Sequence, residues 1–336
     1  MSDDRTRSSL DVSAKGVLTR RRLLQASAAL PLATLAAPAF AQAAAKAPKQ
    51  IRIAYQRGGI LVIAQQQKVL EKYFEPRGIE VVWRVFPFSN PALEALNVGS
   101  MDFSSSGNSP IIFAQAGGFD VQYAATQPSG DGGEGIVVLP SSGITKVAEL
   151  KGKRVGFAKG TSAHYFLVAA LENAGLKYQD VEPVFIAPSD APTALLRGDI
   201  AAWAVWDPYL ALAEKKLGGK VIAALGPDIK SNNFLITRTG FAAEYPETLK
   251  QVLTQLGTIG TWAQSHRNEI AAQLSEITGI ELEIQRVAAE RANYAITPVT
   301  EDVIKRQQAV ADQFEALGII SRKINIRDAV WKGAQA

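Results

Sequence analysis

Two short stretches of the chain share one order of residue types: an extended run, then hydroxyl-bearing and small residues, then an apolar run. The first, over residues 101–116, contains Ser106, Gly107 and Asn108. A helix start leaves backbone N–H groups unpaired and carries a partial positive charge, and glycine lets the backbone approach a guest. The second, over residues 154–171, contains Gly160, Thr161, Ser162, Ala163 and His164. Each stretch therefore predicts an anion site at a helix N-terminus, and the pair predicts one anion held from two sides.

The expected donors come from both turns. One turn offers Ser106 and Asn108, and Gln56, at the end of the first predicted strand, adds an amide. The other turn offers Thr161, Ser162, the N–H of Ala163 and His164. Two alternatives stay open: Ser, Thr and Asn are also preferred helix caps, and His164 is either a donor to a ligand or a neutral, satisfied neighbour in a first helical turn.

Three further residues are placed in the predicted site. Strand alternation separates Trp206 from the core residue Trp203, so Trp206 can lie along the tail of a ligand. Asp207 precedes Pro208, which is a helix-start pattern, although the same cap can face the cleft. Asp190 stands in a similar position before Ala191 and Pro192.

The elements that carry these residues alternate between strands and helices. Strands are predicted at 51–55, 80–86, 121–126, 136–139, 154–157, 181–186 and 202–206. Helices are predicted at 60–74, from Pro91 to about 99, and at 163–174, 190–197 and 208–216, and from Pro246 onward the pattern is mainly helical. This alternation is typical of an α/β fold with parallel sheets covered on both faces.

Two extended segments predict passages between two lobes. The first is polar and glycine-rich and covers residues 127–135, and the second covers residues 232–237. We therefore expect lobe 1 to comprise residues 49–133 and 236–336, and lobe 2 to comprise residues 134–235. Binding clefts form at such junctions, beyond the carboxyl ends of parallel strands, where both predicted turns open.

The composition excludes several classes of function. The chain has 336 residues, of which 47% are hydrophobic and 20% are charged, so it can bury a large core. The first 41 residues hold six Lys or Arg and three Asp, which leaves 30 basic and 29 acidic residues of the totals of 36 and 32. That balance argues against a nucleic-acid surface. The chain has no cysteine, which rules out disulfides, thiolate metal sites and cysteine catalysis. The two histidines do not predict a metal site, and no cofactor is expected.

The N-terminus predicts export. Residues 19–24, Thr-Arg-Arg-Arg-Leu-Leu, match the twin-arginine pattern. An Ala- and Leu-rich stretch follows up to residue 37, and Ala39 and Ala41 provide the small residues of a cleavage site, so we expect a signal peptide over residues 1–41. Pro31, Thr34 and other residues interrupt the apolar stretch, which disfavours the alternative of a membrane anchor.

The mature region resembles the periplasmic binding proteins of sulfonate-uptake ABC transporters, in particular the aliphatic sulfonate-binding family. The runs that carry the resemblance are Arg52–Gly58, Leu93–Asp102, Pro110–Ala116, Leu150–Lys153, Lys159–His164 and Ala202–Tyr209. Where relatives tend to have Ser-Thr-Gly-Asp, this chain has Ser105-Ser106-Gly107-Asn108, which replaces a carboxylate with an amide.

The resemblance implies a two-lobed, hinged fold of the type II periplasmic-binding-protein kind, with two sheets, a two-crossing hinge and a helical C-terminal part. It also implies a periplasmic, monomeric protein that captures a small sulfonate and delivers it to an inner-membrane permease with its ATPase. The alternatives are a carrier for taurine, nitrate or a thiamine-pyrimidine precursor. Taurine calls for an acid facing its ammonium group, for which Glu134 or Asp190 could serve. An enzyme of thiamine-pyrimidine synthesis is disfavoured because that activity goes with a cysteine motif.

Overall fold

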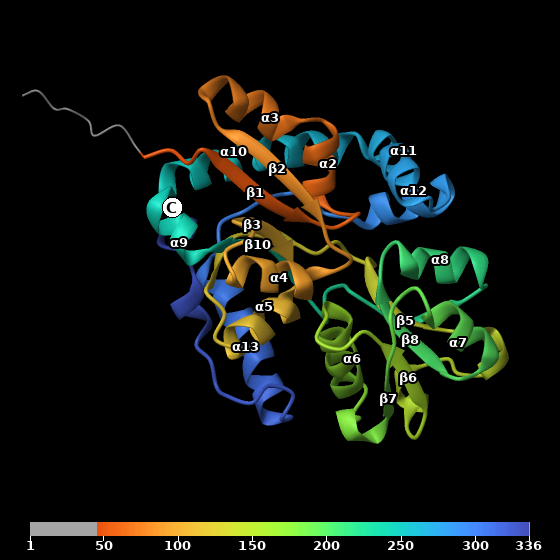
Figure 1. Cartoon of the computed structure of the whole chain (residues 1–336). Helices are drawn as coiled ribbons and strands as arrows, with labels where there is room; N and C mark the ends of the chain where they lie inside the picture. Colours follow the sequence, from red (N-terminus) through yellow and green to blue (C-terminus); the bar gives the residue numbers. More distant parts are fainter. Residues whose placement is uncertain (1–45, 336) are drawn as a thin grey trace, which may run out of the picture. The chain divides into compact units, whose positions relative to one another are not determined.

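The computed structural model describes residues 46–335. The predicted signal peptide over residues 1–41 and its cleavage after Ala41 lie outside the described residues. The described part contains two five-stranded sheets, each with helices packed around it (Figure 1).

Sheet 1 has the strand order β2-β1-β3-β10-β4. Its strands are β1 (Gln50–Tyr55), β2 (Glu80–Val85), β3 (Phe103–Ser106), β4 (Val121–Pro128) and β10 (Asn232–Arg238). Sheet 2 has the strand order β7-β6-β8-β5-β9. Its strands are β5 (Glu134–Val138), β6 (Arg154–Phe157), β7 (Glu182–Phe185), β8 (Ala202–Trp206) and β9 (Lys220–Ala224). The sequence did not predict β9.

Both sheets are mixed, so the prediction of parallel sheets was wrong for one strand in each. β10 runs antiparallel to β3 and β4, and β5 runs antiparallel to β8 and β9. The chain crosses directly from the carboxyl end of β4 into β5, and from the end of β9 into β10. A strand that follows such a crossing starts at the carboxyl edge of its sheet, so it must be antiparallel to its neighbours.

The first crossing is shorter than the sequence suggested, and the second lies earlier in the chain. The first occupies residues 129–133, between β4 and β5, and the second occupies residues 225–231, between β9 and β10. The segment 232–237, predicted as a passage, is most of β10 and belongs to sheet 1. The limit placed at residue 235 between the lobes therefore falls inside a strand.

The helices cover the two sheets and form the C-terminal part. Those before residue 220 are α2 (Ile60–Gln66), α3 (Val69–Phe74), α4 (Ser89–Asn97), α5 (Asn108–Ala116), α6 (Ser162–Asn173), α7 (Ala191–Arg197) and α8 (Tyr209–Lys216). The later ones are α9 (Thr239–Glu244), α10 (Pro246–Ser265), α11 (Arg267–Thr278), α12 (Leu282–Arg291) and α13 (Glu301–Ala316). α10 packs on α2 and α3, whereas α13 packs on α5.

The predicted helix over residues 60–74 is two helices. Lys68 separates them and has a φ of +51°, in the left-handed region. A non-glycine residue in that region ends the run of helical hydrogen bonds. The apolar period continues across the break, with Leu70 and Phe74 fully buried, and this hid the interruption in the sequence.

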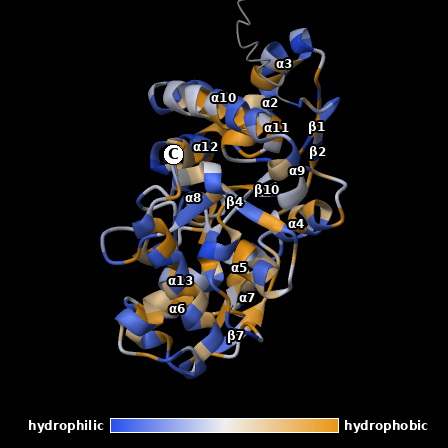
Figure 2. Ribbon diagram, turned by 90° about the vertical axis from the view of Figure 1, so that its left-hand side faces the viewer, coloured by the Kyte–Doolittle hydropathy of each residue, from blue (hydrophilic) through white to orange (hydrophobic). Residues whose placement is uncertain are grey.

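Burial of apolar side chains stabilises each lobe, and Val168 of α6 also joins the core cluster of sheet 1. One core cluster joins both faces of sheet 1 with α10 and α13, and two smaller clusters lie on the two faces of sheet 2. Figure 2 shows hydrophobic and hydrophilic residues together along α10 and α13, as expected of helices with one buried side.

A buried acid ties three strands of sheet 1 together at the edge away from the predicted turns. Asp102, 2% exposed, precedes β3 and accepts from Arg52 Nη2 at 2.6 Å and from Arg238 Nη2 at 3.2 Å. The hydrogen bond to Asp102 raises the pKa of Arg52. These arginines belong to the two strands that flank β3, so the ion cluster supports the strand that leads into the first turn.

We predict that Gly130→Ala lowers the free energy of unfolding by about 1–3 kcal/mol. A Cβ on Gly130 would lie 1.6 Å from the carbonyl oxygen of Arg291, so the first crossing or the end of α12 must shift. Chemical denaturation of the purified variant measures the loss.

Gly257→Ala is the matched control. Gly257 lies inside α10, and a Cβ there would meet no atom within 4 Å. Helix propensity then stabilises the variant by up to about 1 kcal/mol. Equal stability of the two variants would contradict the close packing of the crossing.

Candidate ligand-binding site

The first turn joins β3 to α5. Gly107 is the N-cap residue of α5, between Ser106 and Asn108, which are 3% and 2% exposed. The Ser106 hydroxyl donates to the Gly107 carbonyl at 3.0 Å, and Gln307 of α13 donates to the Asn108 carbonyl at 2.7 Å. The turn is thus held rigidly from both its own strand and the C-terminal helix.

The second turn joins β6 to α6. Gly160 has a φ of +72°, which glycine adopts without strain, and Thr161 is the N-cap residue. The Thr161 hydroxyl donates to the Ala158 carbonyl at 2.7 Å. Ser162 and Ala163 open the helix.

The structure brings these two turns together across the lobes. A Cβ on Gly107 would lie 3.4 Å from the Cβ of Ser162. A Cβ on Gly160 would lie 3.5 Å from the Phe113 ring of α5. α5 and α6 also pack on each other. The starts of two helices from different sheets therefore face a common region.

Neither helix start is capped by a side chain. The alternative that Ser106, Asn108 and Thr161 act as caps is not what the structure has, because no side-chain cap bond forms at α5 or α6. Both hydroxyls donate to carbonyls of their own turns instead. The first backbone N–H groups of both helices, with the positive ends of both dipoles, remain as the donors for an anion.

Gln56 adds a donor beside the first turn. Its Oε1 accepts from the Ser105 hydroxyl at 3.0 Å, which orients the amide, and its Nε2 is buried with no partner in the described part of the chain. A buried donor without a partner lowers the stability of the folded protein by about 1–3 kcal/mol. An acceptor atom of a ligand would remove that penalty.

Asn90 is a candidate that the sequence did not single out. It lies in the first turn of α4, and its Nδ2 is 3.6 Å from where a Cβ on Gly160 would stand. Its Oδ1 is buried without a partner among residues 46–335. The signal was available, since Ser89 and Asn90 precede Pro91, but it was interpreted only as a helix start.

His164 has the structural role that the sequence left as an alternative. It is 1% exposed, its Nδ1 lies 3.3 Å from the Gly160 N–H, and its Nε2 lies 3.1 Å from the Tyr178 hydroxyl. Both ring nitrogens are therefore engaged with the protein, and the ring packs against Phe157 and Phe314. Burial, assisted by the charge of Lys159, lowers the pKa of His164 to about 4.

Trp206 lies beside a buried acid on sheet 2. The antiparallel register of β5 and β8 places Glu134 opposite Trp206, and opposite residues share a sheet face. Glu134 is 3% exposed, and its Oε1 accepts from the Ser162 hydroxyl at 2.7 Å. The half-buried Trp206 is thus placed next to the second turn, whereas Trp203 is 1% exposed and belongs to the core, as predicted.

Asp207 holds the start of α8. Its Oδ1 accepts from the Ala211 N–H at 2.9 Å and lies 3.5 Å from Arg291 Nη1. The helix begins at Tyr209, one residue later than the sequence pattern suggested. Burial raises the pKa of Asp207 to about 6, and the charge of Arg291 opposes that rise. Its Oδ2 is buried without a partner in the described chain.

Asp190 is not brought to the turns by any contact that the structure describes. It is exposed at the start of α7 and accepts from the Ser189 hydroxyl at 3.1 Å. β7, which precedes it, is the outermost strand of sheet 2.

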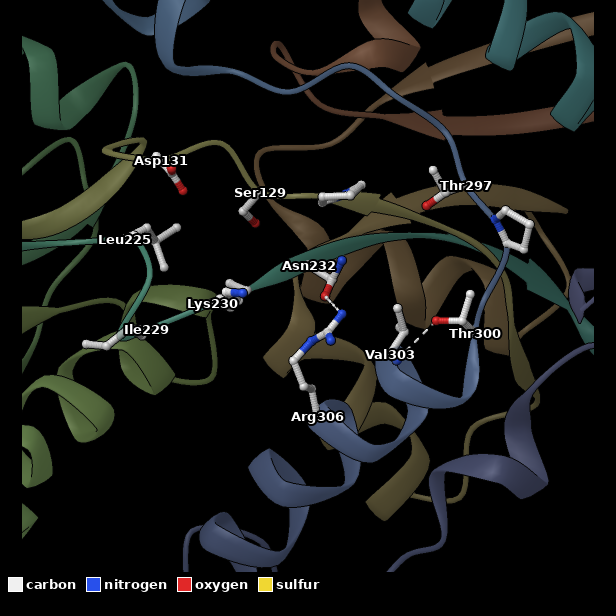
Figure 3. A pocket seen from close by; sticks show the side chains of 14 residues that line it. Ser129, Asp131, Leu225, Ile229, Lys230, Asn232, Thr297, Thr300, Val303 and Arg306 are labelled. Carbon is white, nitrogen blue, oxygen red and sulfur yellow. Dashed lines mark hydrogen bonds between the residues drawn. The ribbon is translucent and has the colours of Figure 1, made fainter.

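A cavity of about 300 Å³ lies at the two crossings, away from the predicted residues. Figure 3 shows Ser129 and Lys230 from the crossings and Arg306 from α13, whose Nη2 lies 3.5 Å from Asn232 Oδ1. None of the predicted site residues lines it. The helix that starts at this cavity, α13, is capped by the Thr300 side chain, so the cavity lacks the uncapped helix start that makes the facing turns the candidate site.

Among residues 46–335, no group of three or more histidine or acidic side chains could hold a metal ion. No helix in that range combines the length and apolar character needed to cross a membrane.

Two α/β lobes joined by two crossings, with their turns facing each other, form the periplasmic-binding-protein fold. The chain matches the family model described as NMT1/THI5 like over residues 60–270, and it belongs to that family.

Known proteins similar to this chain cover almost its whole length. It is 36% identical over 304 residues to a candidate aliphatic sulfonates-binding protein of Escherichia coli (strain K12), with 90% of this chain and 94% of that protein covered. The crystal structure of the periplasmic aliphatic sulphonate binding protein SsuA from Escherichia coli matches with a TM-score of 0.81 and 34% identity, over 86% of this chain and 94% of that one. The alkanesulfonate-binding protein SsuA from Xanthomonas axonopodis pv. citri, bound to MOPS, matches with a TM-score of 0.79 and 32% identity, over 85% and 99%.

We predict that His164 stays neutral in the folded protein from pH 8 to about pH 5, as followed by NMR of its imidazole. Its folded pKa is lowered to about 4, so between pH 6.5 and 4 the unfolded chain binds a proton that the folded chain does not. The histidine's contribution to stability is therefore present above pH 6.5 and lost as pH falls. Between pH 6.5 and 4, the free energy of unfolding of the native protein should fall by about 3 kcal/mol more than that of the His164→Phe variant. A titration of His164 near pH 6.5 would refute the assignment.

Proposed function

We propose that this protein is a periplasmic solute-binding protein that captures aliphatic sulfonates and delivers them to an ABC importer for sulfur acquisition. The observation that carries the proposal is the contact of two uncapped helix starts, α5 of lobe 1 and α6 of lobe 2. The three similar proteins described above are binding proteins by name, and their names point to the same ligand class.

The chemistry of a sulfonate suits these donors. The head group is ionised at any physiological pH, and three oxygens share its single charge. Charge-assisted hydrogen bonds contribute about 1.5–3 kcal/mol each, and a favourable helix start adds up to about 2 kcal/mol. Four or five donors then offset the losses of association and reach micromolar affinity, about −8 kcal/mol.

The ligand contacts that we propose combine both lobes. Lobe 1 supplies the Gln56 amide and the first N–H groups of α5, and lobe 2 supplies the N–H groups of Ser162 and Ala163. The Trp206 ring lies along the ligand's tail. Closure of the lobes about the two crossings would complete the site, and the permease would bind the closed form.

Export and assembly are part of the proposal. The twin-arginine pattern and the predicted cleavage after Ala41 would deliver the folded chain to the periplasm. There we expect a monomer that serves an inner-membrane permease and its ATPase. A nitrate carrier would leave Trp206 without a ligand tail to contact, which favours an organosulfonate.

A ligand panel tests the function. We expect the mature chain, residues 42–336, to gain thermal stability with C2–C6 alkanesulfonates, because a ligand that binds only the native state stabilises it by about 2.7 kcal/mol at a hundredfold excess over Kd. Calorimetry should give micromolar Kd values. Stabilisation by nitrate or alkyl carboxylates of matched length, with none by sulfonates, would overturn the proposal.

We predict that Gln56→Ala weakens alkanesulfonate binding about tenfold, since it removes one donor worth about 1.4 kcal/mol. Gln66→Ala is the matched control, because Gln66 is exposed on α2 and its Nε2 contacts only the neighbouring Gln65. Isothermal titration of both variants gives the comparison. Unchanged affinity in Gln56→Ala would remove this amide from the site.

A further inference from the structure

An acid is buried next to the proposed anion site. Glu134 begins β5, directly after the first crossing, and is 3% exposed. Ser162, the first residue of α6, donates its hydroxyl hydrogen to Glu134 Oε1 at 2.7 Å. The inference drawn from this pair rests on the proposed function, since it concerns the same turn.

The direction of this hydrogen bond opposes anion binding. A serine hydroxyl has one hydrogen, and a sulfonate oxygen can only accept. When Ser162 donates to a carboxylate, it presents lone pairs to the anion. The carboxylate adds a second negative charge in a region shielded from water, where repulsion is strong. A neutral Glu134 reverses both effects, because its own O–H donates to Ser162 Oγ and releases the serine hydrogen for the ligand.

We propose that Glu134 is a positioning residue for the Ser162 hydroxyl, and that sulfonate capture is coupled to the uptake of one proton by the Glu134–Ser162 pair. Affinity then rises as pH falls. The bond length suits either direction of donation, because 2.7 Å is usual for O–H···O.

The groups around Glu134 leave it without a cation. α6 presents Tyr165, a phenol whose pKa is raised by burial and by the charge of Glu134, and β8 presents Trp206. Asp207, directly after β8, is paired with Arg291 of α12. His164 is neutral and bonded to Tyr178, while Arg306 of α13 acts on Tyr165. No Lys, Arg or His of the described chain forms an ion pair with Glu134.

The pKa of Glu134 in the free protein agrees with a role in proton-linked binding. Burial raises the pKa of Glu134 to about 7, although the hydrogen bond from Ser162 opposes that rise. The acid is therefore partly protonated near neutral pH before any ligand binds. Below pH 7 the binding-competent form is already present, and above it each pH unit reduces that form about tenfold.

Calorimetric titration of the mature protein with propanesulfonate tests the proposal. The series runs from pH 5.5 to 8.5, with Bis-Tris and imidazole below pH 7 and triethanolamine and Tris above it, all of which are free of sulfonate groups. We expect Kd to be constant at low pH and to rise towards tenfold per pH unit above pH 7, with proton uptake visible as a buffer-dependent enthalpy. Propanesulfonate does not titrate in this range, so the protein is the source of any dependence. A Kd that stays constant across the series would overturn the proposal.

Glu134→Gln separates this role from a merely structural one. The glutamine amide donates to Ser162 Oγ at every pH, so the variant should bind as the native protein does at pH 5.5 and about thirtyfold more tightly at pH 8.5. Glu182→Gln, an exposed acid on β7 of the same sheet, is the matched control and should keep the native pH profile. Ser162→Ala, a smaller change, should make the profile shallower, because only the repulsion by the Glu134 charge remains, and it provides the test if Glu134→Gln does not fold.

Two other outcomes would overturn the proposal. Weaker binding by folded Glu134→Gln at every pH would mean that the site needs a charged carboxylate. Tighter binding of taurine than of propanesulfonate, increasing with pH, would assign Glu134 to the ligand's ammonium group. Failure of every sulfonate to bind at any pH would instead reject the proposed function, so the two failures are distinguishable.

Discussion

The proposed site depends on balancing the charge of an anion with the partial charges of two helix ends. Neither turn carries a buried Lys or Arg, since Lys159 of the second turn is exposed. Dipoles of this size act only over the first turn of a helix, so both helix starts must lie within hydrogen-bonding reach of one head group. This requirement explains why Gly107 and Gly160 stand where they do: any side chain there would project towards the opposing lobe.

The strand orders of the two sheets follow from the same requirement. Counted from the crossings, sheet 1 runs β4, β10, β3, β1, β2 and sheet 2 runs β9, β5, β8, β6, β7. Each crossing connects the carboxyl edge of one sheet to the carboxyl edge of the other. β10 and β5, which follow the crossings, are therefore antiparallel to their neighbours. The carboxyl edges of the two sheets, with their turns, can therefore face each other only because each sheet contains one antiparallel strand.

Much of this was predictable from the sequence because local patterns decide it. The apolar alternation of β1 and β8, the proline that opens α10 and the small residues of both turns are local signals, and the structure has these elements at the predicted places. The antiparallel strands, β9 and the break at Lys68 were not predictable, because they depend on how distant segments pair. The same holds for the site: the turns were visible in the sequence, whereas the burial of His164 and the place of Asn90 beside Gly160 were set by packing.

The proposed role of Glu134 would let a crossing influence the proposed binding site. It follows the first crossing directly, and its carboxyl group contacts the first residue of α6, so it belongs at once to the hinge region and to the anion turn. Exposure of this carboxyl to water would favour its charged form, since burial is what raises its pKa. A movement about the crossing that hydrates Glu134 would therefore return the Ser162 hydrogen to the carboxylate and weaken the hold on the anion. Opening of the lobes and release of the ligand would then favour each other, which is what a carrier that must surrender its ligand to a permease requires.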